Sequence, residues 1–469
     1  MMKLLLLLLT VSSLWPAPCP GLLVQRPLPW RTSSMWRGGG MESAIALRMS
    51  GDENHSSMRI TGKGDSMREY KLRTKVARGG QQLDGWTTDP LGRSFVNPPV
   101  YRASTITYPS MSALREALKD YPFRGLSYGR HGTPTSFALE EAFAILEGGD
   151  NACVVSSGLA AINAGAPSSI ARAPVMCRAH AAILAFVSAG DHILVSKETL
   201  FLLLVSDGVY DPTRGFCDKF LKRFGVSTTY FDPLSTGEEL GNAIQPNTRV
   251  LFLESPSSLS FEIHDFEALT RVARERNVVV VADNTYGPGL FRPMEWGAHV
   301  SINAATKYIS GHSDVMIGLL ACSKDTYRRV KRSVQQLGCP AGPDDCYLAL
   351  RGFRTLSVRM KAHEEHHLWQ KYFSGSSGLF TFQLKDVFSQ EQVDTFCDSL
   401  SLFEIGYSWG GYESLVLPCD ISSVRSVVPW EYGDGYGATI RLHIGLEDVE
   451  DLIQDLQRAF EMMGAPGKE

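Results

Sequence analysis

Two residues in the second half of the chain, Asp283 and Lys307, have the types and the spacing of a cofactor site. Asp283 ends the run VVVVAD, whose continuous β-branched character predicts a strand buried on both faces. Ligands of such a sheet lie beyond the carboxyl ends of its strands. A lysine can hold pyridoxal phosphate (PLP) as a Schiff base, and a buried carboxylate can keep the pyridine nitrogen of PLP protonated. The pair indicates a PLP site, although an isolated Ala-Thr-Lys is common and an aspartate at a strand end is more often a cap or turn residue.

A phosphate site is indicated by SSGLAA, which begins at Ser156 and follows the strand-like CVV. Backbone amides and hydroxyls at a helix N-terminus bind phosphate, and Gly158 lets the backbone approach closely. Upstream, Tyr128 and Arg130 in SYGRHG add a phenol and a guanidinium suited to phosphate. Each motif also has a plain structural interpretation, the first as a capped helix without a ligand and the second as solvated loop residues.

Tyr210 in DGVYDPT and Arg441 in ATIRLHIG are two further candidates. The Tyr210 ring can lie on the cofactor ring, and the Arg441 guanidinium can bind a substrate carboxylate in bidentate fashion. A single arginine on a strand is more often an ion-pair partner, so this assignment depends on the rest of the chain.

The elements that must position these residues alternate between strand and helix. A turn-rich arm leads into the helical stretch SMSALREALKD and a predicted helix from about Ser136 to Leu146. Strand-like and helix-like segments then alternate from CVV to GLLACSK, which predicts an α/β fold with a mostly parallel sheet, followed by a smaller α+β segment. The boundaries that we expect are a targeting presequence at 1–75, an N-terminal arm at 76–125, a PLP-binding domain at 126–352 and a C-terminal domain at 353–469.

Composition favours a globular enzyme that acts on a small molecule. The 469 residues suffice for two or three domains, and the 44% apolar content allows large cores. The net charge is −4 and no long basic block occurs, so neither nucleic acid nor a membrane surface is an expected partner. Nine cysteines without a CxxC motif argue against a zinc ribbon and a disulfide framework, and favour a reducing compartment.

The first 75 residues differ in kind from the rest. Lys3 precedes the apolar run 4–9, which resembles a secretory signal segment and is too short to span a membrane. Residues 25–58 are rich in Arg and Ser, as in a transit peptide. That order is typical of proteins sent to a plastid of secondary origin, so we expect a plastid protein. The alternative is a cytoplasmic protein whose true start is Met41 or Met67.

From about Val76 to Met463 the chain resembles the Cys/Met-metabolism (trans-sulfuration) family of PLP-dependent enzymes. The resemblance implies fold-type I, the aspartate aminotransferase-like PLP-dependent transferase fold. Eleven phrases in the family's order carry it: VNPPVYRAST, SYGRHGTPT, LEGGDNACVVSSGLAA, FDPL, VLFLESP, ADNTY, AATKYISGHSDVMIG, LRGFRTLSVRM, FSGSSGLF, LFEIGYSWGGYESLVLP and IRLHIGLED.

The resemblance implies a role for each candidate residue. Lys307, Tyr210 and Tyr128 would form the catalytic set, and Asp283 would pair with the pyridine nitrogen. The implied cofactor-binding residues are Lys307, Asp283, Tyr210, Ser157, Gly158, Leu159 and Thr306, with Tyr128 and Arg130 contributed by a neighbouring subunit. The implied substrate-binding residues are Arg441, Ser408 and Trp409. Because such a site is shared between subunits, a homotetramer built from tight dimers is implied.

Two departures indicate a branch of the family. Members that act at the γ-carbon typically carry SATK and a leucine in the SxGGxES phrase, whereas this chain has Ala304 and Trp409. The resemblance to the bacterial β-lyase branch implies cleavage of L-cystathionine to homocysteine, pyruvate and ammonia in methionine biosynthesis. Lys307 must be neutral to take the substrate α-proton. A γ-acting relative, a cysteine desulfhydrase and an inactive homologue stay open as alternatives, as does the preference among cystathionine, cystine and cysteine.

Three features depart from the family pattern. Residues 164–181 form an insert with two prolines, and 197–203 look like added apolar material before Tyr210. Near residue 365 the chain lacks a helix-strand segment, and the junction creates HEEHH at 363–367. This run matches the HExxH zinc pattern, but no third ligand is evident and we expect no metal. Misjoined exons would explain all three features together.

Overall fold

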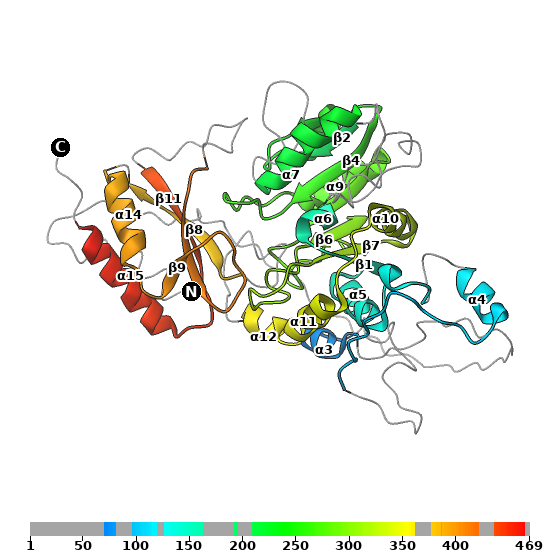
Figure 1. The fold of residues 1–469 in the computed structure, drawn as a ribbon. Helices are drawn as coiled ribbons and strands as arrows, with labels where there is room; N and C mark the ends of the chain where they lie inside the picture. Colours follow the sequence, from blue (N-terminus) through cyan, green and yellow to red (C-terminus); the bar gives the residue numbers. More distant parts are fainter. Residues whose placement is uncertain are drawn as a thin grey trace, which may run out of the picture.

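The computed structural model shows a large α/β domain beside a smaller C-terminal domain (Figure 1). It describes residues 70–80, 96–119, 126–162, 192–195, 209–361, 377–385, 387–421 and 436–464. The inserts at 164–181 and 197–203, the junction at 363–367 and all but the end of the expected presequence lie outside these ranges. Among the described helices, none combines the length and apolar character needed to cross a membrane.

The large domain is built on a seven-stranded sheet in the order β1-β7-β6-β5-β4-β2-β3. Its strands are β1 (Asn151–Val155), β2 (His192–Val195), β3 (Ser227–Tyr230), β4 (Thr248–Glu254), β5 (Val279–Asp283), β6 (Val300–Asn303) and β7 (Gly318–Cys322). β7 runs antiparallel to both of its neighbours, and all other pairings are parallel. β1 therefore runs in the same direction as β6, β5 and β4. Their carboxyl ends meet at one edge of the sheet, where ligands of such folds bind.

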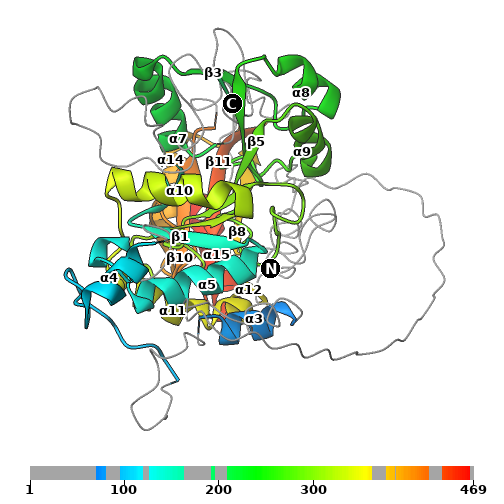
Figure 2. The ribbon, with the colours of Figure 1, turned by 90° about the vertical axis from the view of Figure 1, so that its right-hand side faces the viewer.

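Helices cover both faces of this sheet, as Figures 1 and 2 show. Alternate residues of β1 supply the two cores: Cys153 and Val155 pack with α9 and α10, whereas Ala152 and Val154 pack with α5, α11 and α12. The helices are α3 (Leu72–Arg78), α4 (Met111–Leu118), α5 (Pro134–Glu147), α6 (Gly158–Ile162), α7 (Asp211–Gly215), α8 (Gly237–Ala243), α9 (Phe266–Glu275), α10 (Lys324–Leu337), α11 (Pro343–Phe353), α12 (Leu356–Lys361), α14 (Gln390–Ser399) and α15 (Val449–Met463), with short turns η2 (Gly129–His131), η4 (Phe216–Phe220) and η5 (Leu221–Phe224).

The C-terminal domain is a four-stranded sheet in the order β8-β11-β10-β9, with α14 and α15 packed together on one face (Figure 1). Its strands are β8 (Leu379–Lys385), β9 (Phe403–Ile405), β10 (Ser414–Cys419) and β11 (Tyr436–His443). Phe382 of β8, Phe396 of α14 and Phe460 of α15 form its aromatic core. This packing fixes β11, an inner strand of the smaller sheet, and with it the position of Arg441.

The sequence prediction of a mostly parallel α/β fold with a smaller α+β domain is confirmed. The helix expected near Ser136 to Leu146 is α5, which begins with Pro134 in its first turn and ends at Gly148 with φ 78°. α12 packs with the large domain. Its Leu356 and Met360 belong to the core beneath α5 and α11, although residues after 352 were expected in the C-terminal domain.

Candidate active site

Lys307 lies in the turn that follows β6, at the carboxyl edge of the sheet. Its backbone N–H donates to Ala304 O at 3.0 Å, and its carbonyl accepts from Gly311 N at 2.8 Å. The side chain reaches across to the C-terminal domain, where Nζ donates to Ser408 Oγ at 2.8 Å and lies 5.1 Å from the centre of the Trp409 ring. The catalytic candidate Lys307 and two substrate-binding candidates, Ser408 and Trp409, are therefore brought together.

A buried arginine, Arg359, hydrogen-bonds to the backbone of the Lys307 turn. Arg359 of α12 donates through Nη1 to Tyr308 O at 2.6 Å, and through Nη2 to Ile309 O at 3.2 Å and Gly352 O at 2.9 Å. Gly311 sits against the guanidinium at φ 65°, where a Cβ would lie 2.3 Å from Nη1. Such contacts leave the turn little freedom, so Lys307 projects from a fixed base.

Arg441 of β11 faces the same space as Lys307. Its Nη2 donates to Tyr407 O at 2.8 Å, and with longer contacts to Gly406 O and Ser408 O. Among the described residues no carboxylate pairs with its guanidinium, so its other nitrogens can meet a ligand. Burial, and then the Arg441 charge, lowers the pKa of Lys307 to about 8. A sizeable fraction of the amine is then neutral near pH 7–8.

Asp283 ends β5 and is buried next to β6, the strand that leads into the Lys307 turn. Its Oδ1 accepts from Thr285 N at 3.0 Å and from Thr285 Oγ1 at 2.6 Å. The Thr285 hydroxyl in turn accepts from Ala304 N at 2.9 Å, which ties Asp283 to the start of the Lys307 turn. No cationic side chain of the described residues pairs with Asp283, and burial raises its pKa to about 6. This carboxylate is placed to meet a positive group that none of the described residues supplies.

Tyr210 lies just before α7, with its ring about half exposed at 49%. Its backbone N–H donates to Glu254 Oε2 at 3.0 Å, which fixes the residue to the end of β4 beside Asp283. Burial of the hydroxyl, followed by the nearby Glu254, raises the pKa of Tyr210. The structure thus places Tyr210 at the same edge as Lys307 and Asp283, with about half of the residue exposed.

The sequence-predicted phosphate cradle lies at the end of β1, where α6 begins. Ser157 Oγ accepts from Ala160 N at 3.0 Å, and a Cβ on Gly158 would fall 2.4 Å from the Ala304 Cβ. Only glycine therefore fits between α6 and the Lys307 turn. Leu159 is half-buried on the same turn. The Thr306 hydroxyl donates to Ile317 O at 3.2 Å and accepts from Ile317 N at 2.9 Å, so in this structure it binds backbone.

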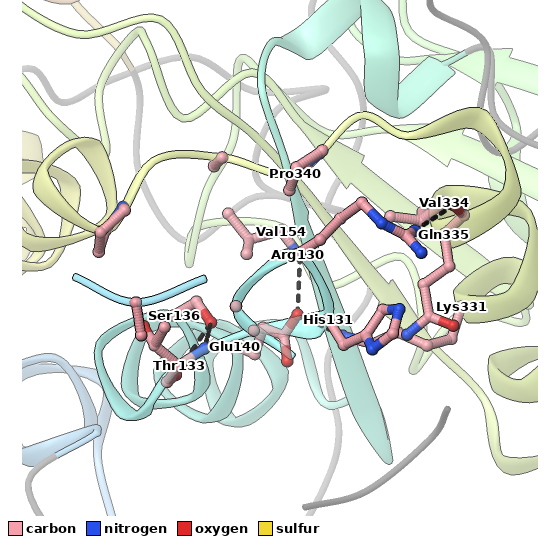
Figure 3. A pocket seen from close by; sticks show the side chains of 15 residues that line it. Arg130, His131, Thr133, Ser136, Glu140, Val154, Lys331, Val334, Gln335 and Pro340 are labelled. Carbon is pink, nitrogen blue, oxygen red and sulfur yellow. Dashed lines mark hydrogen bonds and ion pairs between the residues drawn. The ribbon is translucent and has the colours of Figure 1, made fainter. Parts of the chain in front are cut away.

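Tyr128 and Arg130 lie apart from this group. Arg130 points toward the end of α10 and donates to Gln335 O at 2.7 Å, in a cavity that also contains His131, Glu140 and Lys331 (Figure 3). None of the residues around Lys307 lines that cavity. Tyr128 is 45% exposed. Within one chain Arg130 therefore binds the end of α10 and does not line the Lys307 site.

Three residues near the site were not assigned from the sequence: Glu254, Ser258 and Tyr286. Tyr286 stacks on Trp409 with ring centroids 4.6 Å apart, and its hydroxyl lies 3.2 Å from Ser258 Oγ. Glu254 accepts a hydrogen bond from the same Ser258 hydroxyl. The sequence did contain an indication for Glu254, because Glu254 ends the strand-like run VLFLE just as Asp283 ends VVVAD. Parallel strands bring such ends together.

Comparison with known proteins identifies the family. The family model "Cys/Met metabolism PLP-dependent enzyme" matches residues 73–366 and 361–461. The chain belongs to this family. Its similar relatives include "Cystathionine beta-lyase MetC" of Escherichia coli (strain K12), 36% identical over 84% of this chain and 99% of the relative. An "L-alanine/L-glutamate racemase" of Wolbachia pipientis wMel is 34% identical over 79% of this chain and 94% of the relative.

The solved structures agree with this assignment. The structure of MetB from Corynebacterium glutamicum superimposes with a TM-score of 0.67 at 26% identity, covering 84% of this chain and 99% of that one. The enzyme is therefore a PLP-dependent carbon–sulfur lyase of fold-type I. The sequence prediction of family, fold and cofactor is confirmed.

The site residues fit PLP. Lys307 supplies an amine whose pKa is lowered, and Asp283 supplies a buried carboxylate without a cation among the described residues. Gly158 allows the α6 backbone to lie against the Lys307 turn. When bound, PLP supplies an electron sink for charge that develops at the substrate α-carbon. Among the described residues, no group of three or more His, Cys, Asp or Glu side chains could hold a metal ion.

Proposed function

We propose that this enzyme is a cystathionine β-lyase, which cleaves L-cystathionine and water to homocysteine, pyruvate and ammonia. The observation that carries the proposal is the meeting of Lys307 with Ser408, Trp409 and Arg441 over the sheet edge that holds Asp283. The relatives named cystathionine beta-lyase from Escherichia coli and Haemophilus influenzae, 36% and 35% identical over 84% of this chain, support it.

The residues divide the work between binding and proton transfer. Arg441 is placed to bind the substrate α-carboxylate, because its guanidinium is fixed on one side by the Tyr407 carbonyl and pairs with no carboxylate among the described residues. Lys307, as the neutral amine, takes the α-proton, and Ser408 orients its Nζ. The β-carbon–sulfur bond then breaks with its electron pair going to sulfur, and the three-carbon remainder hydrolyses to pyruvate and ammonia.

The test is product analysis with the purified full chain and added PLP. We expect equal amounts of pyruvate and homocysteine from L-cystathionine, and loss of both products in Lys307→Ala. 2-Oxobutyrate in place of pyruvate would assign the enzyme to the γ-acting members of the family. Conversion of L-alanine to D-alanine without cystathionine cleavage would favour the racemase activity that the Wolbachia relative is named for. An inactive homologue would give none of these products.

We also propose that the active enzyme is a homotetramer in which Tyr128 and Arg130 complete the site of a neighbouring subunit. The cavity that holds Arg130 contains none of the residues around Lys307, which supports this arrangement. Tyr128→Phe and Lys307→Ala each remove one half of such a site, so mixing the two inactive variants and reassembling them should restore part of the activity. No recovery, or a monomer by light scattering, would contradict it.

For the location we propose import into a plastid of secondary origin. The order of an apolar segment and an Arg- and Ser-rich segment in residues 1–75 supports it. Residues 1–75 fused to a fluorescent protein should direct it to the plastid in a cell that has such an organelle. Fluorescence spread through the cytoplasm would favour a start at Met41 or Met67.

A further inference from the structure

Two buried carboxylates lie side by side at the sheet edge that holds the cofactor. Glu254 ends β4 and Asp283 ends β5, and the two residues are opposite each other in the parallel register. Their side chains therefore project from the same face of the sheet. Glu254 is 2% exposed and Asp283 is 7% exposed. The family roles described above use only Asp283.

Both carboxyl oxygens of Glu254 are occupied by groups that shape the site. Oε2 accepts from Tyr210 N at 3.0 Å, and Oε1 accepts from the Ser258 hydroxyl. Ser258 lies 3.2 Å from the Tyr286 hydroxyl, and the Tyr286 ring stacks on Trp409. Glu254 thus holds the residue expected over the cofactor ring and, through Ser258, the aromatic pair beside Lys307.

Burial and the neighbouring Asp283 favour the neutral form of Glu254. Burial, and then the adjacent Asp283, raises the pKa of Glu254 well above its usual range. The other titratable groups that face it are the phenols of Tyr210 and Tyr286, while the His264 ring faces its backbone. Among the described residues no cation pairs with it. A negative charge on Asp283 opposes a second charge on the adjacent Glu254, and the pyridine nitrogen requires the ionised form of Asp283.

We propose that Glu254 is a positioning residue for the cofactor, which as a neutral acid holds the Tyr210 backbone and the Ser258–Tyr286 pair while Asp283 alone carries the negative charge. Glu254 then fixes the geometry of the site without competing for the pyridine nitrogen. The inference concerns PLP binding and is independent of which amino acid the enzyme cleaves.

The experiment measures the dissociation constant of PLP from the apo-enzyme, by fluorescence, in three variants of Glu254. Glutamine is isosteric with the neutral acid. Each can accept from Tyr210 N and donate to Ser258 Oγ, which reverses the direction of the Ser258 hydrogen bond and leaves the Ser258 hydroxyl to donate to Tyr286. Glu254→Gln should therefore bind PLP within about threefold of the wild type. Glu254→Ala loses both contacts, and Glu254→Asp is too short to keep them, so each should bind PLP roughly tenfold or more weakly. If the alanine variant does not fold, Glu254→Asp provides the measurement of weakened PLP binding in its place. Glu262→Gln, on the loop after β4, is the matched control.

The pH profile of PLP binding separates positioning from a general loss of structure. With a neutral Glu254, the midpoint set by Asp283 should be the same in Glu254→Gln and the wild type. If Glu254 were charged in the wild type, its charge would raise the pKa of Asp283 and with it the pH midpoint of PLP binding. The glutamine variant would then have a lower midpoint than the wild type, and the proposal would be wrong. It would also be overturned if Glu254→Gln bound PLP as weakly as Glu254→Ala, or if neither the alanine nor the aspartate variant lost affinity.

Discussion

Trp409 and Tyr286 stack face to face, with ring centroids 4.6 Å apart and ring planes 14° from parallel. Trp409 belongs to the C-terminal domain and Tyr286 to the loop after β5 of the large domain, so the stack joins the two domains. Lys307 Nζ lies 5.1 Å from the centre of the same Trp409 ring. The Tyr286–Trp409 stack therefore joins the two domains, and its Trp409 ring also lies against the catalytic lysine.

Removing the Trp409 ring should destabilise the protein. Trp409 is 7% exposed and contacts Tyr308 as well as Tyr286, so Trp409→Ala leaves a cavity between the domains. We expect a loss of about 3–5 kcal/mol in the free energy of unfolding, measured by urea denaturation. Trp409→Phe keeps an aromatic face and should lose clearly less. Equal stability of the alanine variant and the wild type would show that the stack does not hold the domains together.

Arg441 should lower the pH at which Lys307 becomes able to capture PLP. The neutral amine is the reactive form, so the rate of PLP capture should rise with pH through the Lys307 pKa of about 8. Burial is the larger cause of the lowered pKa and the Arg441 charge is the second. Arg441→Met removes that charge, so the pKa should rise and the rate profile should move to higher pH.

The measurement is the visible absorbance of apo-enzyme mixed with PLP at a series of pH values. Arg351→Met, at an exposed position of α11, is the control and should leave the profile unchanged. A profile that Arg441→Met leaves in place would assign the lowered pKa to burial alone.

Much of the site could be predicted from the sequence because parallel strands place their carboxyl ends together. Gly158, Asp283 and Lys307 all follow strand-like runs, and the structure brings them to one edge of the sheet. The strand-end position of Glu254 was visible in the sequence, but its hydrogen bond to the Tyr210 backbone was not, and neither was the stacking of Tyr286 on a tryptophan of the second domain. No periodicity in the chain encodes such contacts between distant segments.

Asp283 should make the apo-enzyme less stable while it makes PLP binding possible. Burial raises its pKa from 3.8 to about 6, so the folded state binds a proton more tightly than the unfolded state. The stability that this proton provides is present below pH ~4 and is lost as the pH rises through about 6. Above that range the apo-enzyme holds a poorly solvated carboxylate.

Asp283→Asn removes that charge and keeps an acceptor for Thr285. We expect the apo variant to be more stable than the wild type at pH 7.5 by roughly 1–3 kcal/mol, and the difference to vanish near pH 4. PLP should bind the variant at least about tenfold more weakly. Thermal denaturation of both apo-proteins across this pH range checks the first expectation, and a wild type that is the more stable protein at neutral pH would refute it.

The buried pair of Lys331 and Glu140 should make a large contribution that depends on both partners. Lys331 Nζ donates to Glu140 Oε1 at 2.9 Å, and Glu140 also accepts from Val154 N of β1 at 3.0 Å (Figure 3). Burial is the largest single influence on Lys331 and opposes its charge, but Glu140, Tyr327 and Cys153 together exceed it and raise the pKa of Lys331. The pair therefore joins α10, α5 and β1 as an ionised unit.

Lys331→Met leaves the Glu140 carboxylate buried without its partner, so we expect a loss of about 3–5 kcal/mol in the free energy of unfolding. Adding Glu140→Gln removes the stranded charge and keeps an acceptor for Val154 N, so the double variant should recover most of that loss. Arg271→Ala breaks the exposed pair with Glu275, where both side chains are more than half exposed, and should cost less than about 0.5 kcal/mol. Urea denaturation of the three variants measures these differences. If the double variant were no more stable than Lys331→Met, the loss would come from packing of the Lys331 stem between α10 and its neighbours α5 and β1, because an unpaired carboxylate could no longer be its cause.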